Sequence, residues 1–266
     1  VLAGLPLTVN GVLYNVAAVL HDGDILGFVP KSYLPTYSEF YEGRHYHSGA
    51  DIETDVLFNG RTYPFGTRLL FRCRQMPAFT LGIEICEDLW VAQPPSISHA
   101  LAGATVIANL SASDETTGKD IYRRSLVSGQ SARLVCGYIY ADAGEGESST
   151  DLVFGAHNLI CENGSILAES ERFSNQMIMA DMDMSKLISE RRRMTTWQPK
   201  FDNGYRVIDF DLEMHEVDLR RFIDPHPFVP DDAMDRTRRC EEILTIQAMG
   251  LKKRLAHTHC RHAVVG

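Results

Sequence analysis

The stretch Phe79-Thr-Leu-Gly-Ile-Glu-Ile-Cys86, followed by Glu87-Asp-Leu-Trp90, decides the fold class together with the apolar run 104–110. Both runs are continuous and of strand length, which is typical of strands buried on both faces of a sheet. A helix is predicted for 119–134 and another buried strand for 134–141. Because strands and helices alternate along the chain, we predict an α/β fold.

Tight hairpins indicate that the sheets are mixed and not purely parallel. The runs 14–20 and 25–29 are separated by His21-Asp-Gly-Asp24, and Asn163-Gly164 separates 156–161 from 165–168. Short loops with Gly or Asn-Gly are typical of antiparallel hairpins. A further strand is predicted for 177–182, leading into a helix that ends near Met194.

Composition excludes some classes of protein. The 266 residues are 44% hydrophobic and carry a formal net charge of −9, which argues against nucleic-acid binding. We expect no membrane segment, because no run of about eighteen apolar residues occurs. The six cysteines show no regular spacing and no Cys-x-x-Cys, which favours reduced thiols in a cytoplasmic protein.

The composition shifts near Trp197. Residues 1–200 form the predicted main domain, and the polar, proline-rich stretch 201–232 is predicted to be a linker. Apolar residues at helical spacing predict a helix over 233–257, and the segment up to Gly266 is expected to begin a strand. We expect that the natural protein continues on both sides of this chain.

Two residues are candidates for nucleophilic chemistry. Cys86 stands where an apolar strand meets the polar pair Glu87-Asp88, the kind of sheet edge that presents side chains to a crevice. A thiolate needs a nearby cation and donors for the oxyanion. Lys31 follows the 25–29 strand among apolar and aromatic residues. Taken singly, a core cysteine and a surface lysine are the commoner interpretations, and the residues alone leave both open.

Several blocks together carry a family resemblance. They are Lys31-Ser-Tyr-Leu-Pro35 with Glu42, Ile85-Cys-Glu-Asp-Leu-Trp90, Asn109-Leu-Ser-Ala-Ser113, Ala143-Gly-Glu-Gly-Glu-Ser148 and Cys161-Glu-Asn-Gly164. The chain resembles the nitrilase, or carbon–nitrogen hydrolase, superfamily and, within it, the glutaminase domains of glutamine-dependent NAD+ synthetases. The resemblance covers essentially the whole chain. It implies a nitrilase-like four-layer α-β-β-α sandwich with mixed sheets.

The resemblance also implies roles for residues. Cys86 would attack the side-chain amide of glutamine, and Lys31 with the backbone N–H of Glu87 would stabilise the oxyanion. Glu42 would position these groups, with Glu39 as the alternative. The third member of the family's triad, a glutamate acting as general base, has no counterpart here because residues 1–30 contain no Glu. We therefore expect little glutaminase activity from this chain by itself.

The substrate side of the site is predicted from the same resemblance. Ser113 and Lys119 would bind the amino-acid head of glutamine, although a helix-capping turn is an alternative for the serine. The aromatic residues Tyr33, Tyr37 and Phe40 would wall the pocket and restrict water, and ordinary core packing is an equal alternative for each of them. Tyr37, Phe40 and Glu87 are further candidates for substrate binding. We expect the loop 144–150 near the mouth of the active site, and we predict no metal site.

The function implied is the release of ammonia from glutamine for a synthetase domain outside these residues. ATP, Mg2+ and deamido-NAD are expected to bind there, because the loop Ser-Gly-Gly-x-Asp-Ser of that domain does not occur in this sequence. Glutamine and further copies of the chain are the expected partners. The alternatives are a free-standing amidase of the same superfamily and a non-catalytic oligomerisation module.

Overall fold

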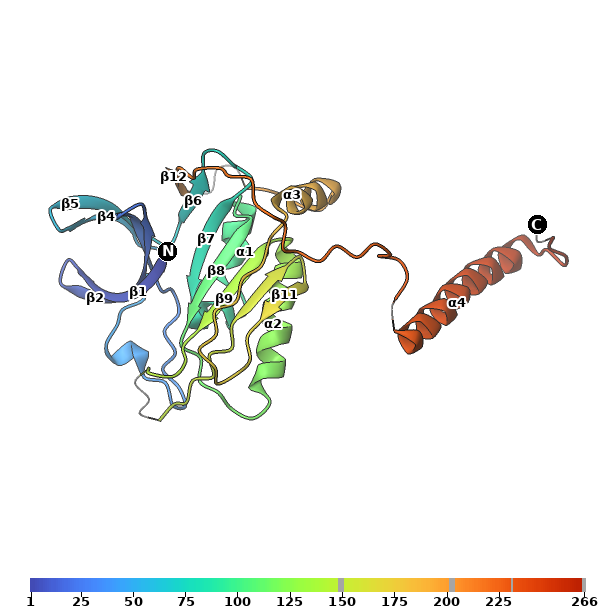
Figure 1. The fold of residues 1–266 in the computed structure, drawn as a ribbon, viewed down its shortest axis with the longest axis horizontal. Helices are drawn as coiled ribbons and strands as arrows, with labels where there is room; N and C mark the ends of the chain where they lie inside the picture. The colour runs from blue at the N-terminus through green and yellow to red at the C-terminus, as the bar shows by residue number, and fades with distance from the viewer. Residues whose placement is uncertain (148–150, 201–203, 231, 265–266) are drawn as a thin grey trace. The chain divides into compact units, whose positions relative to one another are not determined.

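The computed structural model describes residues 1–147, 151–200, 204–230 and 232–264. The chain forms two compact units, residues 1–220 and residues 221–266. The first unit contains two β-sheets and the helices that cover one of them (Figure 1). The predicted α/β class is confirmed by this alternation of strands and helices.

The first sheet has five strands in the order β1-β2-β3-β5-β4. Most neighbours are antiparallel, whereas β3 and β5 are parallel, so the sheet is mixed. The hairpin between β2 and β3 turns at Asp22-Gly23, which both have positive φ, as the sequence predicts. The strands are β1 (Leu2–Val9), β2 (Val12–His21), β3 (Asp24–Pro30), β4 (Glu53–Phe58) and β5 (Arg61–Gly66).

The second sheet has seven strands in the order β11-β10-β9-β8-β7-β6-β12. Its centre, β7-β8-β9, is parallel, so the carboxyl ends of these three strands meet at one edge. The predicted hairpin at Asn163-Gly164 joins β10 to β11. The strands are β6 (Leu69–Cys73), β7 (Thr80–Ile85), β8 (Val106–Ser111), β9 (Gly137–Asp142), β10 (Leu159–Glu162), β11 (Ser165–Glu169) and β12 (Arg206–Phe210).

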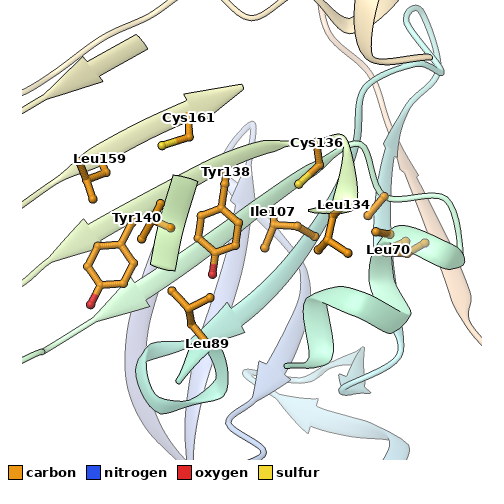
Figure 2. Close-up of a cluster of buried hydrophobic side chains, with 12 residues drawn as sticks. Leu70, Leu89, Ile107, Leu134, Cys136, Tyr138, Tyr140, Leu159 and Cys161 are labelled. Carbon is orange, nitrogen blue, oxygen red and sulfur yellow. The ribbon is translucent and has the colours of Figure 1, made fainter. Parts of the chain in front are cut away.

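Helices α1 (Pro95–Leu101) and α2 (Lys119–Leu134) pack on the seven-stranded sheet, and α3 (Met184–Arg193) follows β11. A buried apolar cluster seals this layer and includes Ile107, Leu134, Tyr138 and Leu159 (Figure 2). A second cluster, which includes Val29, Phe71 and Ile83, takes residues from both sheets. Both faces of the second sheet are therefore buried, which agrees with the continuous hydrophobic runs of its central strands.

Of the four predicted layers, the described residues form the two sheets and the helices on the second. No helix longer than the three-residue 3-10 turn Glu42–Arg44 joins the first sheet's strands within these parts of the chain. The first sheet instead buries its other face in its own curve, where Tyr14, Phe28 and Phe65 form a cluster.

Two sequence-based predictions are wrong. Residues 177–182 form no strand in the described chain; Met177 and Met179 are exposed, and the segment pairs with no sheet edge. The predicted linker is wrong for Arg206–Phe210, because these residues form β12 and pair in parallel with β6. The charged residues of this segment misled the prediction: Asp209 pairs with Arg72, whereas Phe210 is partly buried and packs against the cluster between the sheets.

The second unit consists mainly of helix α4 (Ala233–Thr258). Asp232 caps it by accepting a hydrogen bond of 2.8 Å from the Asp235 N–H. Residues 259–264 form no strand, and the remainder of the strand predicted up to Gly266 lies outside the described residues. Within the described chain, no helix combines the length and apolar character needed to cross a membrane.

Candidate active site

Cys86 lies at the carboxyl end of β7, as the sequence predicts, and begins the short 3-10 helix η2 (Cys86–Leu89). Its φ of +46° lies in the left-handed region, which side chains other than glycine rarely adopt. Such strained backbone is concentrated at functional sites. The residue forms part of the wall of a cavity of about 650 Å³.

Lys31 follows β3 and is buried. Its ammonium pairs with the carboxylate of Glu42, and the same carboxylate accepts a hydrogen bond of 2.6 Å from the Asn15 side chain. Both Lys31 and Glu42 line the cavity that Cys86 lines. Glu39 is also on its wall, but Glu42 is the carboxylate paired with the lysine.

The electrostatics of the thiol reflect two opposing effects. Burial raises the pKa of Cys86, and this is the larger effect; the Lys31 ammonium lowers it. The carboxylates of Glu42 and Asp142 add to the rise because they repel a thiolate. The thiol therefore needs both the cation and a proton acceptor to react as a thiolate near neutral pH.

A second hollow, of about 320 Å³, adjoins the thiol. The predicted substrate-binding residues all line it: Tyr37, Phe40, Glu87, Ser113 and Lys119. The structure therefore brings together every residue predicted for the site, because Cys86 and Phe40 line both hollows.

Polar contacts hold the walls of this second hollow. The Tyr37 hydroxyl donates to Glu87 at 2.7 Å, and this hydrogen bond raises the pKa of Tyr37 to about 12. Lys119 pairs with Asp114, and its ammonium lies 5.3 Å from the centre of the Trp90 ring. The hollow thus carries the Glu87 carboxylate and the Lys119–Asp114 ion pair.

Asp88 connects the two catalytic segments, a role that sequence reasoning missed. One carboxylate oxygen accepts the N–H groups of Ser32 at 3.1 Å and Tyr33 at 2.9 Å, next to Lys31. The other accepts the Ile85 N–H at 2.9 Å, next to Cys86. Burial raises the pKa of Asp88 to about 7, in spite of these bonds. The acidic residue two positions after the cysteine was the only signal in the sequence.

Arg123 supports the side of the second hollow that Ser113 and Asp114 line, a role that sequence reasoning also missed. Its guanidinium is fully buried, pairs with Glu115 at 2.9 Å, and donates to the Ser113 hydroxyl at 3.4 Å and to the Asp114 carbonyl at 3.2 Å. The charge at one turn's spacing from Lys119 on α2 was the only hint in the sequence. The structure shows that this arginine faces inward.

Part of the loop 144–150 lies at the first cavity. Glu147 lines the first cavity, whereas Ser148 to Thr150 lie outside the described residues. In the part of the chain that the structure describes, no three His, Cys, Asp or Glu side chains group so as to hold a metal ion.

The chain belongs to a known class of hydrolase. The family model for carbon-nitrogen hydrolases matches residues 1–192, and the chain belongs to that family. A carbon-nitrogen hydrolase from Helicobacter pylori G27 shares the fold, with a TM-score of 0.54 over 72% of this chain and 64% of that one, at 18% identity. The nitrilase-like α/β fold with mixed sheets is confirmed.

The particular relatives are glutamine-dependent NAD(+) synthetases. Those of Mycobacterium tuberculosis (strain ATCC 25618 / H37Rv) and Mycobacterium leprae (strain TN) are 44% and 42% identical to it over alignments of 273 positions, which cover 99% of this chain. The chain spans 40% of the length of these relatives. A crystal structure of such a synthetase from Cytophaga hutchinsonii has 31% identity and a TM-score of 0.56, over 64% of this chain and 27% of that chain.

Proposed function

We propose that this chain is the glutaminase part of a glutamine-dependent NAD+ synthetase. It would release ammonia from glutamine for the ATP-dependent amidation of deamido-NAD to NAD+. The observation that carries the proposal is the common cavity of Cys86, Lys31 and Glu42, in which the lysine is buried and paired. The similarity to named NAD(+) synthetases supports the choice of glutamine as substrate.

In the proposed reaction, Cys86 Sγ forms a bond to the amide carbon of the glutamine side chain. The oxyanion that develops is stabilised by the Lys31 ammonium and the Glu87 N–H. The carbon–nitrogen bond then breaks and ammonia leaves with the proton that the thiol gave up. Water hydrolyses the resulting thioester, which releases glutamate and restores the thiol.

The proton transfers need a general base. Glu42 is engaged with Lys31 and Asn15, and residues 1–30 hold no glutamate to supply the third member of the family's triad. We therefore expect this chain by itself to turn over glutamine slowly, while Cys86 keeps its reactivity toward electrophiles.

The second hollow would take the amino-acid head of the substrate. Lys119 and Ser113 suit the α-carboxylate because they offer an ammonium and a hydroxyl, and Glu87 suits the α-ammonium because it offers a carboxylate. Tyr37 and Phe40 would exclude water from the bound side chain.

The remaining parts of the proposal concern the whole enzyme. ATP, Mg2+ and deamido-NAD would bind to a synthetase domain outside these 266 residues. The segment 201–232, apart from β12, and the segment 233–266, which contains α4, would connect this chain to that domain. We also expect a cytoplasmic enzyme that assembles as a homo-oligomer.

The test compares two nitrogen sources in a protein that carries this chain together with the flanking segments proposed for it, one that supplies the general base and one that forms the synthetase domain. Cys86→Ala should lower glutamine-driven NAD+ formation at least about a hundredfold and leave ammonia-driven formation within about twofold. Cys240→Ala, at an exposed cysteine on α4, is the matched control and should change neither.

Three outcomes would contradict the proposal. Equal loss of both activities in Cys86→Ala would refute the division of labour. Glutamine hydrolysis that never supports NAD+ formation would favour a free-standing amidase. The absence of both activities from the unmodified protein would favour a non-catalytic module.

A further inference from the structure

The backbone of Cys86 is held in its unusual conformation by one side chain. Asn109 Oδ1 accepts the Cys86 N–H at 3.0 Å, and Asn109 Nδ2 donates to the Cys86 carbonyl at 3.4 Å. The side-chain amide therefore contacts the polar groups on both sides of the Cys86 Cα. Because φ is positive there, these contacts favour a conformation that a cysteine would otherwise leave.

The sheet register places Asn109 for this task. β8 lies parallel to β7, with Asn109 opposite Glu84 and Leu110 opposite Ile85. Asn109 is buried and is absent from the walls of both hollows. It therefore acts on the cysteine from beneath the site and makes no contact with the space for substrate.

The orientation of the Asn109 amide is itself determined by neighbours. Ser111 Oγ donates to Asn109 Oδ1 at 2.7 Å, and Asn109 Nδ2 donates to the Tyr138 hydroxyl at 3.4 Å. The Tyr138 hydroxyl gives its own proton to Glu84, so its oxygen is left to accept from Asn109. Glu84 also accepts the Ser96 N–H at 2.8 Å.

This hydrogen-bond network is buried. Glu84, Asn109 and Tyr138 are each no more than 1% exposed, and Tyr138 stands among the buried residues of the core cluster (Figure 2). Burial and the neighbouring Glu84 raise the pKa of Tyr138, so the phenol keeps its proton. A fully satisfied buried network of this kind has one low-energy arrangement.

We propose that Asn109 is the positioning residue of the nucleophile, and that Tyr138 and Glu84 orient it. The proposal rests on the proposed function of Cys86. The network fixes the Cys86 Cα, from which Sγ projects, and the start of η2, which carries the Glu87 N–H. Its loss therefore displaces the nucleophile and one oxyanion donor together.

The test uses the 266-residue chain and three probes of Cys86. The first is a glutamine-shaped diazoketone, 6-diazo-5-oxo-L-norleucine, which measures saturable labelling. The second is iodoacetamide, which measures the reactivity of the thiol and its dependence on pH. The third is hydrogen exchange at the Cys86 amide, which reports the hydrogen bond to Asn109 directly.

Tyr138→Phe removes a single hydroxyl and keeps the ring in the core. We expect the maximal rate of diazoketone labelling to fall about tenfold, with half-saturation within about twofold. The pH midpoint of iodoacetamide alkylation should stay unchanged, and Cys86 amide exchange should accelerate. Asn109→Ala should show the same changes, more strongly.

Tyr63→Phe is the matched control. It also removes a buried tyrosine's hydroxyl bound to a carboxylate, Asp24, at 3.0 Å, but in the first sheet. It should leave all three readouts unchanged. Urea unfolding of each variant separates a lost fold from a displaced nucleophile.

Two results would overturn the proposal. One is unchanged amide exchange in both Tyr138→Phe and Asn109→Ala; the other is faster exchange with unchanged labelling rates. If the unmodified chain is never saturably labelled by the diazoketone, the proposed function fails. The amide exchange and the iodoacetamide rates of the variants then still decide whether the network positions the thiol.

Discussion

Replacing Glu42 by Gln removes the charge that neutralises the buried Lys31 ammonium. The side chains of Lys31 and Glu42 are 4% and 16% exposed, so water cannot replace the lost carboxylate. Breaking a buried pair on one side typically costs ~3–5 kcal/mol. Because Gln keeps an acceptor for Asn15 and for the lysine, we expect the lower end, about 3 kcal/mol of lost stability.

The assay is urea unfolding at pH 7, followed by tryptophan fluorescence. Both tryptophans, Trp90 and Trp197, lie in the unit 1–220, so the signal reports the unit that contains the pair. Glu190→Gln is the matched control, because Glu190 pairs with Arg193 on the surface of α3 with side chains 37% and 74% exposed.

The control should lose less than about 0.5 kcal/mol, as exposed pairs do. A loss below about 1 kcal/mol for Glu42→Gln, or one equal to the control's, would refute the reasoning. That result would mean that the Lys31 site is wetter, or more adaptable, than its burial indicates. Diazoketone labelling should also slow in Glu42→Gln. The thiolate is then no longer repelled by Glu42, but the lysine that stabilises it is no longer held in position, and we expect this loss to be the larger effect.

Two further predictions concern the supports of the site. The pKa of Asp88 is raised to about 7 in the folded chain, so the carboxyl there binds a proton that the unfolded chain has already lost above about pH 4. Its contribution to stability therefore falls as pH rises from about 4 to 7. In Asp88→Asn, the free energy of unfolding should depend less on pH over this range. An unchanged dependence on pH would contradict the raised pKa of Asp88. Arg123→Met removes one partner of Glu115 and the hydrogen bond to the Ser113 hydroxyl. Urea unfolding should therefore show a free energy of unfolding lower by about 3 kcal/mol. The diazoketone should also need a higher concentration for half-saturation, because the Ser113 loop is less well held. Unchanged half-saturation would show that Arg123 does not support the substrate wall.

Much of the fold could be predicted because its signals are local. The apolar runs that form β7 and β8 and the helix of α2 are each recognisable from a few neighbouring residues. The hairpins at Asp22-Gly23 and Asn163-Gly164 were predictable for the same reason, since glycine permits the positive φ that these turns require.

The errors arose where pairing is long-range. β12 joins β6 from more than a hundred residues away, and its charged residues are neutralised by partners that proximity in sequence does not reveal. Residues 177–182 have an apolar pattern but pair with no strand in the described chain, and a strand needs a partner for its backbone hydrogen bonds. Local pattern contains neither kind of information.

The sequence by itself determined the α/β class, the family and the cysteine at the end of its strand. Tertiary structure decided the chemistry around that cysteine: Glu42 pairs with Lys31, Asp88 joins the lysine loop to the cysteine turn, and Asn109 holds the Cys86 backbone. The physical reason is that an apolar pattern can be recognised within a few neighbouring residues, whereas the contacts of buried polar groups depend on the register and packing of whole strands.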